Sequence, residues 1–136
     1  MTKSYMQISV LSISGLIAIG FGGTILIAPE AFYATYGITL GHDPSQLNEI
    51  RASGGALLGL GLVIAAGAIW SQLTFASIVA SSAVYLSYGL SRLVSLALDG
   101  SPNDGLIVAA VLELGIGVVS LFTLCRYLRG ARIRTS

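Results

Sequence analysis

Four long apolar segments dominate this sequence and limit the folds open to it more than any other feature. They cover about residues 6–28, 44–70, 73–98 and 102–128. Each exceeds the roughly 18 residues that mark a candidate transmembrane helix, and at about 1.5 Å per residue each can cross a hydrocarbon core of about 30 Å. The sequence therefore predicts an all-α integral membrane protein, a bundle of four transmembrane helices.

The composition agrees with a membrane protein and excludes several kinds of site. Charged residues make up 10% of the 136 residues and hydrophobic residues 54%, whereas soluble domains carry roughly 25% charged residues. A chain of this length forms one domain, here residues 1–136. Its single cysteine, Cys125, excludes an internal disulfide, and His42 has no ligand partner at a suitable spacing. We therefore expect no metal and no cofactor.

Stop and start signals set the boundaries of the four segments. Pro29 ends the first, and Asp43-Pro44 provides an N-cap and a proline at the first helical position for the second. Asp99-Gly100 ends the third, and Ser101-Pro102 repeats the cap and proline for the fourth. Between the first two segments we expect a short loop or an interfacial helix on the outer side.

The basic residues predict the orientation, because Lys and Arg are retained on the cytoplasmic side. With four spans both termini face the same compartment, which we expect to be the cytoplasm of a bacterium, with the protein in its inner membrane. The tail 129–136 is expected to contact anionic lipid headgroups, and its arginines are too few for a nucleic-acid site. Five of the seven basic residues lie near the two ends of the chain: Lys3, Arg126, Arg129, Arg132 and Arg134.

Four other charged residues lie inside the apolar segments. From the predicted boundaries, Glu49, Arg51, Arg92 and Glu113 lie about 7 to 14 Å inside the outer surface. A charge at that depth needs a partner, and Arg92 and Glu113 belong to neighbouring spans. The sequence therefore predicts a charge cluster in the outer half of the bundle, with an intramembrane salt bridge between Arg92 and Glu113.

Helical spacing predicts that these charges point into the bundle. On the third span a polar stripe recurs at steps of three and four residues, and small residues share the faces of Arg51 and Glu113, as is typical of close helix contacts. The stripe comprises Ser81, Tyr85, Tyr88, Arg92, Ser95 and Asp99. The predicted cluster comprises Glu49, Arg51, Tyr85, Tyr88, Arg92 and Glu113. The predicted packing glycines are Gly54, Gly55, Gly59 and Gly117.

The order of short motifs resembles a bacterial family of small four-span membrane proteins known only as a domain of unknown function. The motifs are Ala28-Pro29-Glu30, Glu49-Ile-Arg51-Ala-Ser-Gly54-Gly55 with Gly59 and Gly61, Arg92 followed by Asp99-Gly100-Ser-Pro102, and Glu113-Leu-Gly115. Some members are labelled phage infection protein, and the build is loosely similar to DoxX-like proteins. The resemblance implies a four-span inner-membrane protein with these signature residues and supplies no reaction.

Three classes of function fit these features. The cluster could bind an amphiphile such as a lipid, a quinone or a sterol-like molecule, in a protein that acts alone or as an accessory subunit of a membrane complex. Alternatively, the charges only fix the fold of a structural or interaction protein, which could form a homo-oligomer. In the third class Glu113 is the proton-coupled group of a small transporter. Catalysis is disfavoured, because a carboxylate held ionised by Arg92 is in the wrong state for a general acid.

Overall fold

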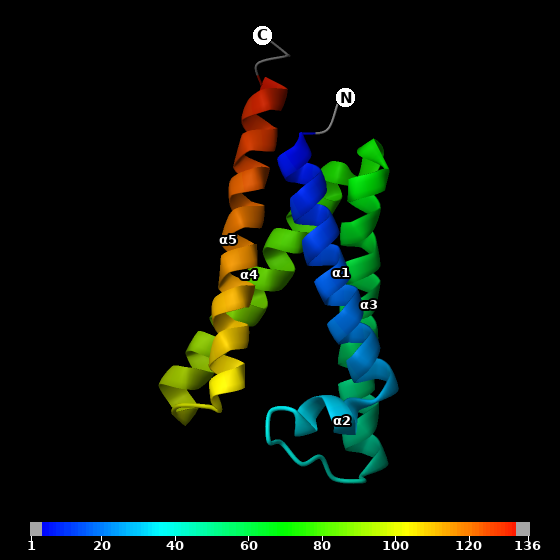
Figure 1. Cartoon of the computed structure of the whole chain (residues 1–136), viewed down its shortest axis with the longest axis vertical. Helices are drawn as coiled ribbons and strands as arrows, with labels where there is room; N and C mark the ends of the chain where they lie inside the picture. Colours follow the sequence, from blue (N-terminus) through cyan, green and yellow to red (C-terminus); the bar gives the residue numbers. More distant parts are fainter. Residues whose placement is uncertain (1–3, 133–136) are drawn as a thin grey trace.

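The computed structural model describes residues 4–132 and consists of helices joined by short connections (Figure 1). Four are long: α1 (Tyr5–Ile27), α3 (Pro44–Ile69), α4 (Thr74–Asp99) and α5 (Asp104–Arg132). A short helix α2 (Pro29–Ala34) lies between the first two, and a 3-10 turn η1 (Ser71–Leu73) connects α3 to α4. The predicted fold class is confirmed, including the short helix after the first span.

Local signals explain where the helices begin and end. The Asp43 side chain accepts a hydrogen bond from the Ser45 N–H at 3.1 Å, and Pro44 begins α3. Gly100, with φ of 92°, ends α4 in a conformation that favours glycine. The fourth long helix begins at Asp104 instead of residue 102, because the Asn103 side chain caps it by accepting from the Gly105 N–H at 2.7 Å.

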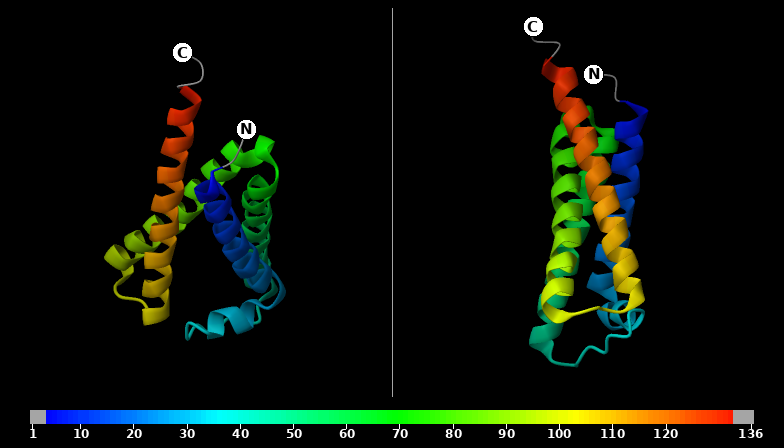
Figure 2. Two further views of the ribbon diagram at one scale, coloured as in Figure 1. Left: turned by 45° about the horizontal axis from the view of Figure 1, so that its top comes forward. Right: turned by 90° about the vertical axis from the view of Figure 1, so that its left-hand side faces the viewer.

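The long helices form two antiparallel hairpins, α1 with α3 and α4 with α5 (Figures 1 and 2). The hairpins lie together at the end that contains η1 and the starts of α1 and α4, which we call the closed end. They diverge toward the opposite end, which contains α2 and the α4–α5 connection and which we call the open end. The helix α2 lies across the open end, below the space between the hairpins (Figure 1).

Glycines allow α1 and α3 to pack backbone against backbone. A Cβ atom at Gly15 would lie 2.7 Å from the Ala65 nitrogen, and one at Gly61 would lie 2.7 Å from the Ile19 nitrogen. Such distances leave no room for a side chain, so these positions fix how closely the two helices approach.

The predicted packing glycines differ in their surroundings. A Cβ atom at Gly54 would lie 2.8 Å from the Leu26 nitrogen, and one at Gly117 would lie 2.9 Å from the Leu86 nitrogen. At Gly55 the first neighbouring atom is 4.0 Å away, and at Gly59 nothing lies within 4 Å. Gly59 therefore faces away from the helix contacts of the described chain.

Small hydroxyl side chains join the two hairpins where they lie together. Ser81 of α4 donates to the Ser14 Oγ of α1 at 3.0 Å and shares a hydrogen bond with the Ser120 Oγ of α5 at 2.9 Å. All three serines are buried, and we call them the serine node. Around them the core is small, with Leu11, Ile64 and Ile78 fully buried. The serine node joins both hairpins through side-chain hydrogen bonds, which is typical of helices packed in membranes.

The outward faces of the helices are apolar and exposed, as expected for contact with lipid. Val111 and Leu112 on α5 are 65% and 60% exposed, and Leu62 on α3 is 55% exposed. Within the described residues, four helices are long and apolar enough to cross a membrane. A water-soluble monomer rarely leaves so much contiguous apolar surface uncovered.

Candidate functional site

Arg92 and Glu113 form a two-pronged ion pair between α4 and α5. The Arg92 Nε donates to the Glu113 Oε2 at 2.7 Å, and the Arg92 Nη2 donates to Oε1 at 3.0 Å. The side chains are 32% and 18% exposed, so the pair is partly covered and not fully buried. Paired donors of this kind fix both the distance and the orientation of two side chains.

Helical periodicity shows that this ion pair points into the space between the hairpins. Tyr85 donates a hydrogen bond from its hydroxyl to the Ser14 carbonyl of α1, and Arg92 lies on the same face of α4 two turns later. Glu113 lies two turns before Ser120, whose hydroxyl belongs to the serine node. Both partners therefore face α1 from the part of the α4–α5 hairpin that diverges toward the open end.

Arg51 and Glu49 lie apart from this pair. Arg51 donates through Nη1 to the Leu26 carbonyl and, at 3.1 Å, to the Ile27 carbonyl. These carbonyls end α1 and have no partner within that helix, so Arg51 caps the helix. Glu49 is exposed and forms no ion pair with any described residue. The structure thus joins Arg92 with Glu113 but does not bring Glu49 and Arg51 to them by any hydrogen bond among residues 4–132.

The two tyrosines of the predicted cluster have different roles. Tyr85 is buried, and its hydroxyl links α4 to α1. Tyr88 is 41% exposed, and its hydroxyl has no hydrogen-bond partner among the described residues. Tyr88 lies one turn before Arg92 on the polar stripe, so it is an accessible donor beside the ion pair.

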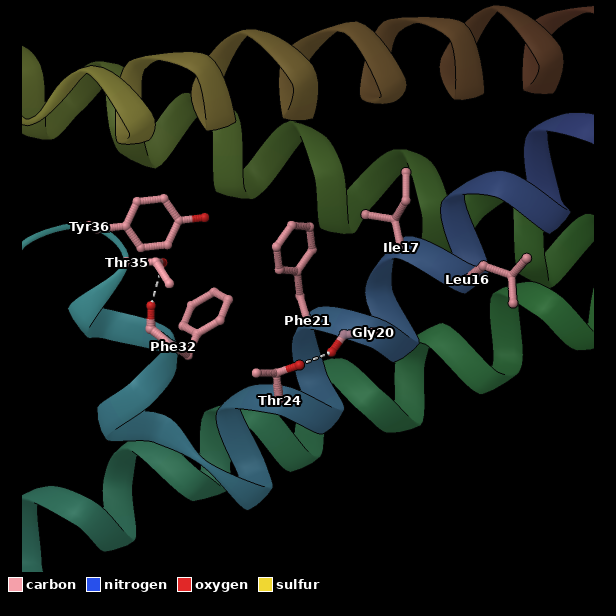
Figure 3. Close-up of a pocket in the computed structure, with 8 residues that line it drawn as sticks. All are labelled: Leu16, Ile17, Gly20, Phe21, Thr24, Phe32, Thr35 and Tyr36. Carbon is pink, nitrogen blue, oxygen red and sulfur yellow. Dashed lines mark hydrogen bonds between the residues drawn. The ribbon is translucent and has the colours of Figure 1, made fainter.

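An open groove of about 430 Å³ lies along α1 and α2 (Figure 3). Its walls include Ile17, Gly20 and Phe21 of α1, with Phe32 and Tyr36 at the α2 segment. The rings of Phe21 and Phe32 meet edge to face at 5.8 Å, and those of Phe32 and Tyr36 at 5.5 Å. None of the residues of the predicted charge cluster lines this groove.

The remaining residues of the groove keep it apolar. The Thr24 hydroxyl donates to the Gly20 carbonyl at 2.8 Å, and the Thr35 hydroxyl donates to the Phe32 carbonyl at 2.6 Å. Both hydroxyls are thus occupied by nearby backbone, as Figure 3 shows. Leu16 adds an aliphatic side chain. Tyr36 therefore supplies the phenol at the open end of an otherwise apolar groove.

The groove opens toward the hairpin that carries the ion pair. Phe21 lies two turns after Ser14 and on the same face of α1, toward the open end. Figure 3 shows Ile17 and Phe21 directed to the side on which α4 and α5 lie, with the Tyr36 side chain running along the gap. Measured from the serine node, Phe21 and Glu113 are each seven residues away, about 10 Å along their helices. The aromatic wall and the ion pair therefore lie at similar distances from the serine node along their helices, on faces that point toward the other hairpin.

The segment after α2 limits this space at the open end. A Cβ atom at Gly105, in the first turn of α5, would lie 3.1 Å from Cδ1 of Tyr36 and 3.0 Å from Oδ1 of Asn103. The Tyr36 ring thus contacts the beginning of α5 from across the gap between the hairpins. Sequence reasoning did not identify the groove, because its wall of phenylalanine, leucine and glycine resembles any lipid-facing or packing surface.

The residues that the structure describes contain no group of three or more His, Cys, Asp or Glu side chains that could hold a metal ion. What the two hairpins do offer is a set of oriented hydrogen-bond donors and an apolar wall. Cys125 is exposed and forms no disulfide. Such an arrangement is suited to holding a molecule with one polar end and one apolar body.

Four apolar membrane-length helices, arranged as two hairpins with an ion pair on one and an aromatic groove on the other, define a four-span helical membrane protein. The family model of the domain of unknown function DUF4345 matches residues 6–124, and the chain belongs to that family. No curated protein and no solved structure matches the chain significantly. The match confirms the resemblance to a domain of unknown function and leaves the activity to be inferred from the structure.

Proposed function

We propose that this protein binds an amphiphilic small molecule from the lipid bilayer in the space between its two hairpins. The apolar body of the molecule lies against Phe21 and Phe32, and its polar end points toward Arg92 and Glu113. Two observations carry this proposal: an open aromatic groove on α1 and the α2 segment, and a partly exposed ion pair on the other hairpin. Helical spacing directs the two features toward each other.

The size and chemistry of the space support this binding role. Small-molecule sites are typically concavities of about 300–1,000 Å³ with mostly apolar walls and a few oriented polar groups. The groove has a volume of about 430 Å³ and apolar walls, but it is shallow and largely open. Its α1 residues belong to a span with a lipid-facing surface, so in this proposal a ligand enters from the bilayer without crossing water. In this proposal the ion pair is intramembrane, where charged residues are costly and mark functional sites.

The binding proposal can be tested by a substitution that fills the groove with a side chain. Gly20 lines the groove, and nothing lies within 4 Å of the position of its Cβ, so Gly20→Leu adds a side chain to the groove without a clash in the protein. Gly59→Leu is the matched control, since Gly59 is equally free of neighbours and lies on α3 outside the groove. Both changes replace a helical glycine, so their effects on helix propensity are alike.

Native mass spectrometry of the protein purified in mild detergent measures the result. We expect an amphiphile to copurify with the wild type and with Gly59→Leu, and to be lost from Gly20→Leu. The proposal is contradicted if no amphiphile copurifies with the wild type, or if the amphiphile remains bound unchanged in Gly20→Leu.

A second, architectural role is favoured by the geometry of the ion pair itself. Both carboxylate oxygens of Glu113 accept hydrogen bonds from Arg92, and the two residues come from the two helices of one hairpin. The pair can therefore fix the register of α4 against α5 without any ligand. Because both Glu113 oxygens accept hydrogen bonds from Arg92, a proton-coupled transport role is disfavoured. Transport would require Glu113 to exchange protons and hence to leave Arg92.

A further inference from the structure

The ion pair leaves specific hydrogen-bond donors unused. Arginine carries five N–H donors in a planar fork, and Glu113 accepts one from Nε and one from Nη2. The Nη1 nitrogen of Arg92 has no partner among the described residues. No buried polar side-chain atom in that part of the chain lacks a partner, so the Nη1 nitrogen must be accessible from outside the protein.

The charge of the site, in contrast, is already balanced. The positive charge of Arg92 and the negative charge of Glu113 lie within 2.7 Å of each other. An anionic head group would meet Glu113 as well as Arg92, and a cationic one would meet Arg92 as well as Glu113. Either would lose its hydration on entering and gain little net attraction.

From these two observations we infer that the ligand has an uncharged polar end that carries an oxygen acceptor, a hydroxyl or a carbonyl group. This inference rests on the proposed binding function and names the chemical class of the ligand. The oxygen accepts a hydrogen bond from the Arg92 Nη1, and the accessible Tyr88 hydroxyl on the same face of α4 is a second donor. A hydrogen bond from a charged donor to a neutral oxygen needs no countercharge and is stronger than one between neutral groups.

Tryptophan quenching can test this selectivity at the groove. The protein has one tryptophan, Trp70, which is replaced in Trp70→Phe so that Phe21→Trp becomes the reporter. Three probes share one dibrominated octadecyl chain and differ in the head group: the alcohol, the sulfate and the trimethylammonium. The control carries Phe122→Trp with Trp70→Phe, because Phe122 is 56% exposed on α5 and lies outside the groove.

We expect saturable quenching of the groove tryptophan by the alcohol at a mole fraction in detergent about tenfold below that needed for either charged probe. The control tryptophan should show unsaturable quenching that is equal for all three. Equal, saturable quenching of the groove tryptophan by all three probes overturns the head-group inference and leaves the binding function intact. If no probe gives a saturable component and no amphiphile copurifies with the wild type, the proposed function itself is wrong.

A substitution in the ion pair tests the cause of the selectivity. Glu113→Gln leaves Arg92 as a net positive charge, so the preference should change from the alcohol to the sulfate. A retained preference for the alcohol in a folded Glu113→Gln protein shows that charge balance does not set the selectivity. Circular dichroism and gel filtration check whether Glu113→Gln folds. If it does not fold, the inference is decided by comparing the three head groups in the protein with an intact ion pair.

Discussion

Arg51 and Glu49 show how two charged residues of one helix can have unrelated surroundings. The Arg51 guanidinium contacts the carbonyls of Leu26 and Ile27 at the end of α1, and Glu49 is exposed. A cap of this kind ties the α3 segment that follows the loop to the end of α1. The residue therefore acts on the hairpin α1–α3 and not on the ion pair.

The capping role predicts unequal effects for these two neighbours. Arg51→Met keeps the aliphatic stem and removes the donors, so it should lower the free energy of unfolding by about 1.5–3 kcal/mol, the range for hydrogen bonds with a charged group. Glu49→Gln should change it by less than about 0.5 kcal/mol, as expected for an exposed side chain. Thermal unfolding in detergent measures both, and equal effects of the two substitutions would refute the capping role.

For Arg92 and Glu113, a charge swap separates architecture from binding. Because each single substitution to alanine leaves an unpaired charge in a partly covered place, each should destabilise the protein by about 1–3 kcal/mol, less than a fully buried pair would. The double variant Arg92→Glu with Glu113→Arg should recover most of the thermal stability. A double variant no more stable than the single ones would show that the pair does not fix the hairpin.

Ligand binding by the swapped protein gives the second part of the same experiment. If the swapped protein regains stability but no longer copurifies with the amphiphile, the ion pair is part of a binding site. In the swapped protein the unused donors of the arginine project from α5 and no longer from α4, so they cannot reach the ligand in the same way. Recovered stability together with unchanged binding supports a purely architectural pair.

At the scale of elements, the close contact of α1 with α3 depends on glycines that have no room for a side chain. Gly61 and Gly59 are two residues apart on α3, yet the Cβ position at Gly61 is 2.7 Å from backbone of α1 and that at Gly59 meets nothing. The contrast offers a matched pair of substitutions within one turn of helix.

We expect Gly61→Ala to destabilise the protein by about 1–3 kcal/mol, because the two backbones must separate to admit the methyl group. Gly59→Ala should be neutral or stabilising by up to about 1 kcal/mol, since alanine favours the helix and nothing opposes it. The two melting temperatures in the same detergent provide the measurement. A Gly61→Ala protein as stable as wild type would mean that α1 and α3 do not pack in this way.

The whole molecule shows which features a single sequence can predict. The caps at Asp43 and Gly100 are local signals, and they place α3 and the end of α4 without tertiary information. Helical spacing likewise placed Arg92 and Glu113 on inward faces of neighbouring spans, and they are hydrogen bonded in the structure. The partner of Arg51 was not predictable, because spacing gives the face of a helix but not the segment that packs against it.

The divergence of the hairpins likewise could not be predicted from the sequence. The serine node holds the hairpins together nearer the closed end, through contacts between residues far apart in sequence. The groove follows from that divergence and from the position of α2, which lies across the open end (Figure 1). Apolar residues such as Phe21 and Phe32 carry no signal that separates a groove wall from a lipid-facing surface.

The orientation of the molecule in the membrane remains a prediction from the distribution of basic residues. It places the closed end, where the described chain begins and α5 ends, in the cytoplasm, and the open end with the groove and ion pair on the outer side. The two tight connections offer reporters at opposite ends, because Ser71 in η1 and Ser101 between α4 and α5 are both exposed. Each can become the single cysteine of a Cys125→Ser protein.

Labelling with a thiol reagent that does not cross membranes then reads the orientation in intact cells that express the protein. Ser101→Cys should react at once, whereas Ser71→Cys should react only after the membrane is permeabilised. The parent with Cys125→Ser controls for background, and labelling after permeabilisation shows that both cysteines are reactive. The opposite pattern would place the groove and the ion pair on the cytoplasmic side, and a bound amphiphile would then have to enter from the inner leaflet.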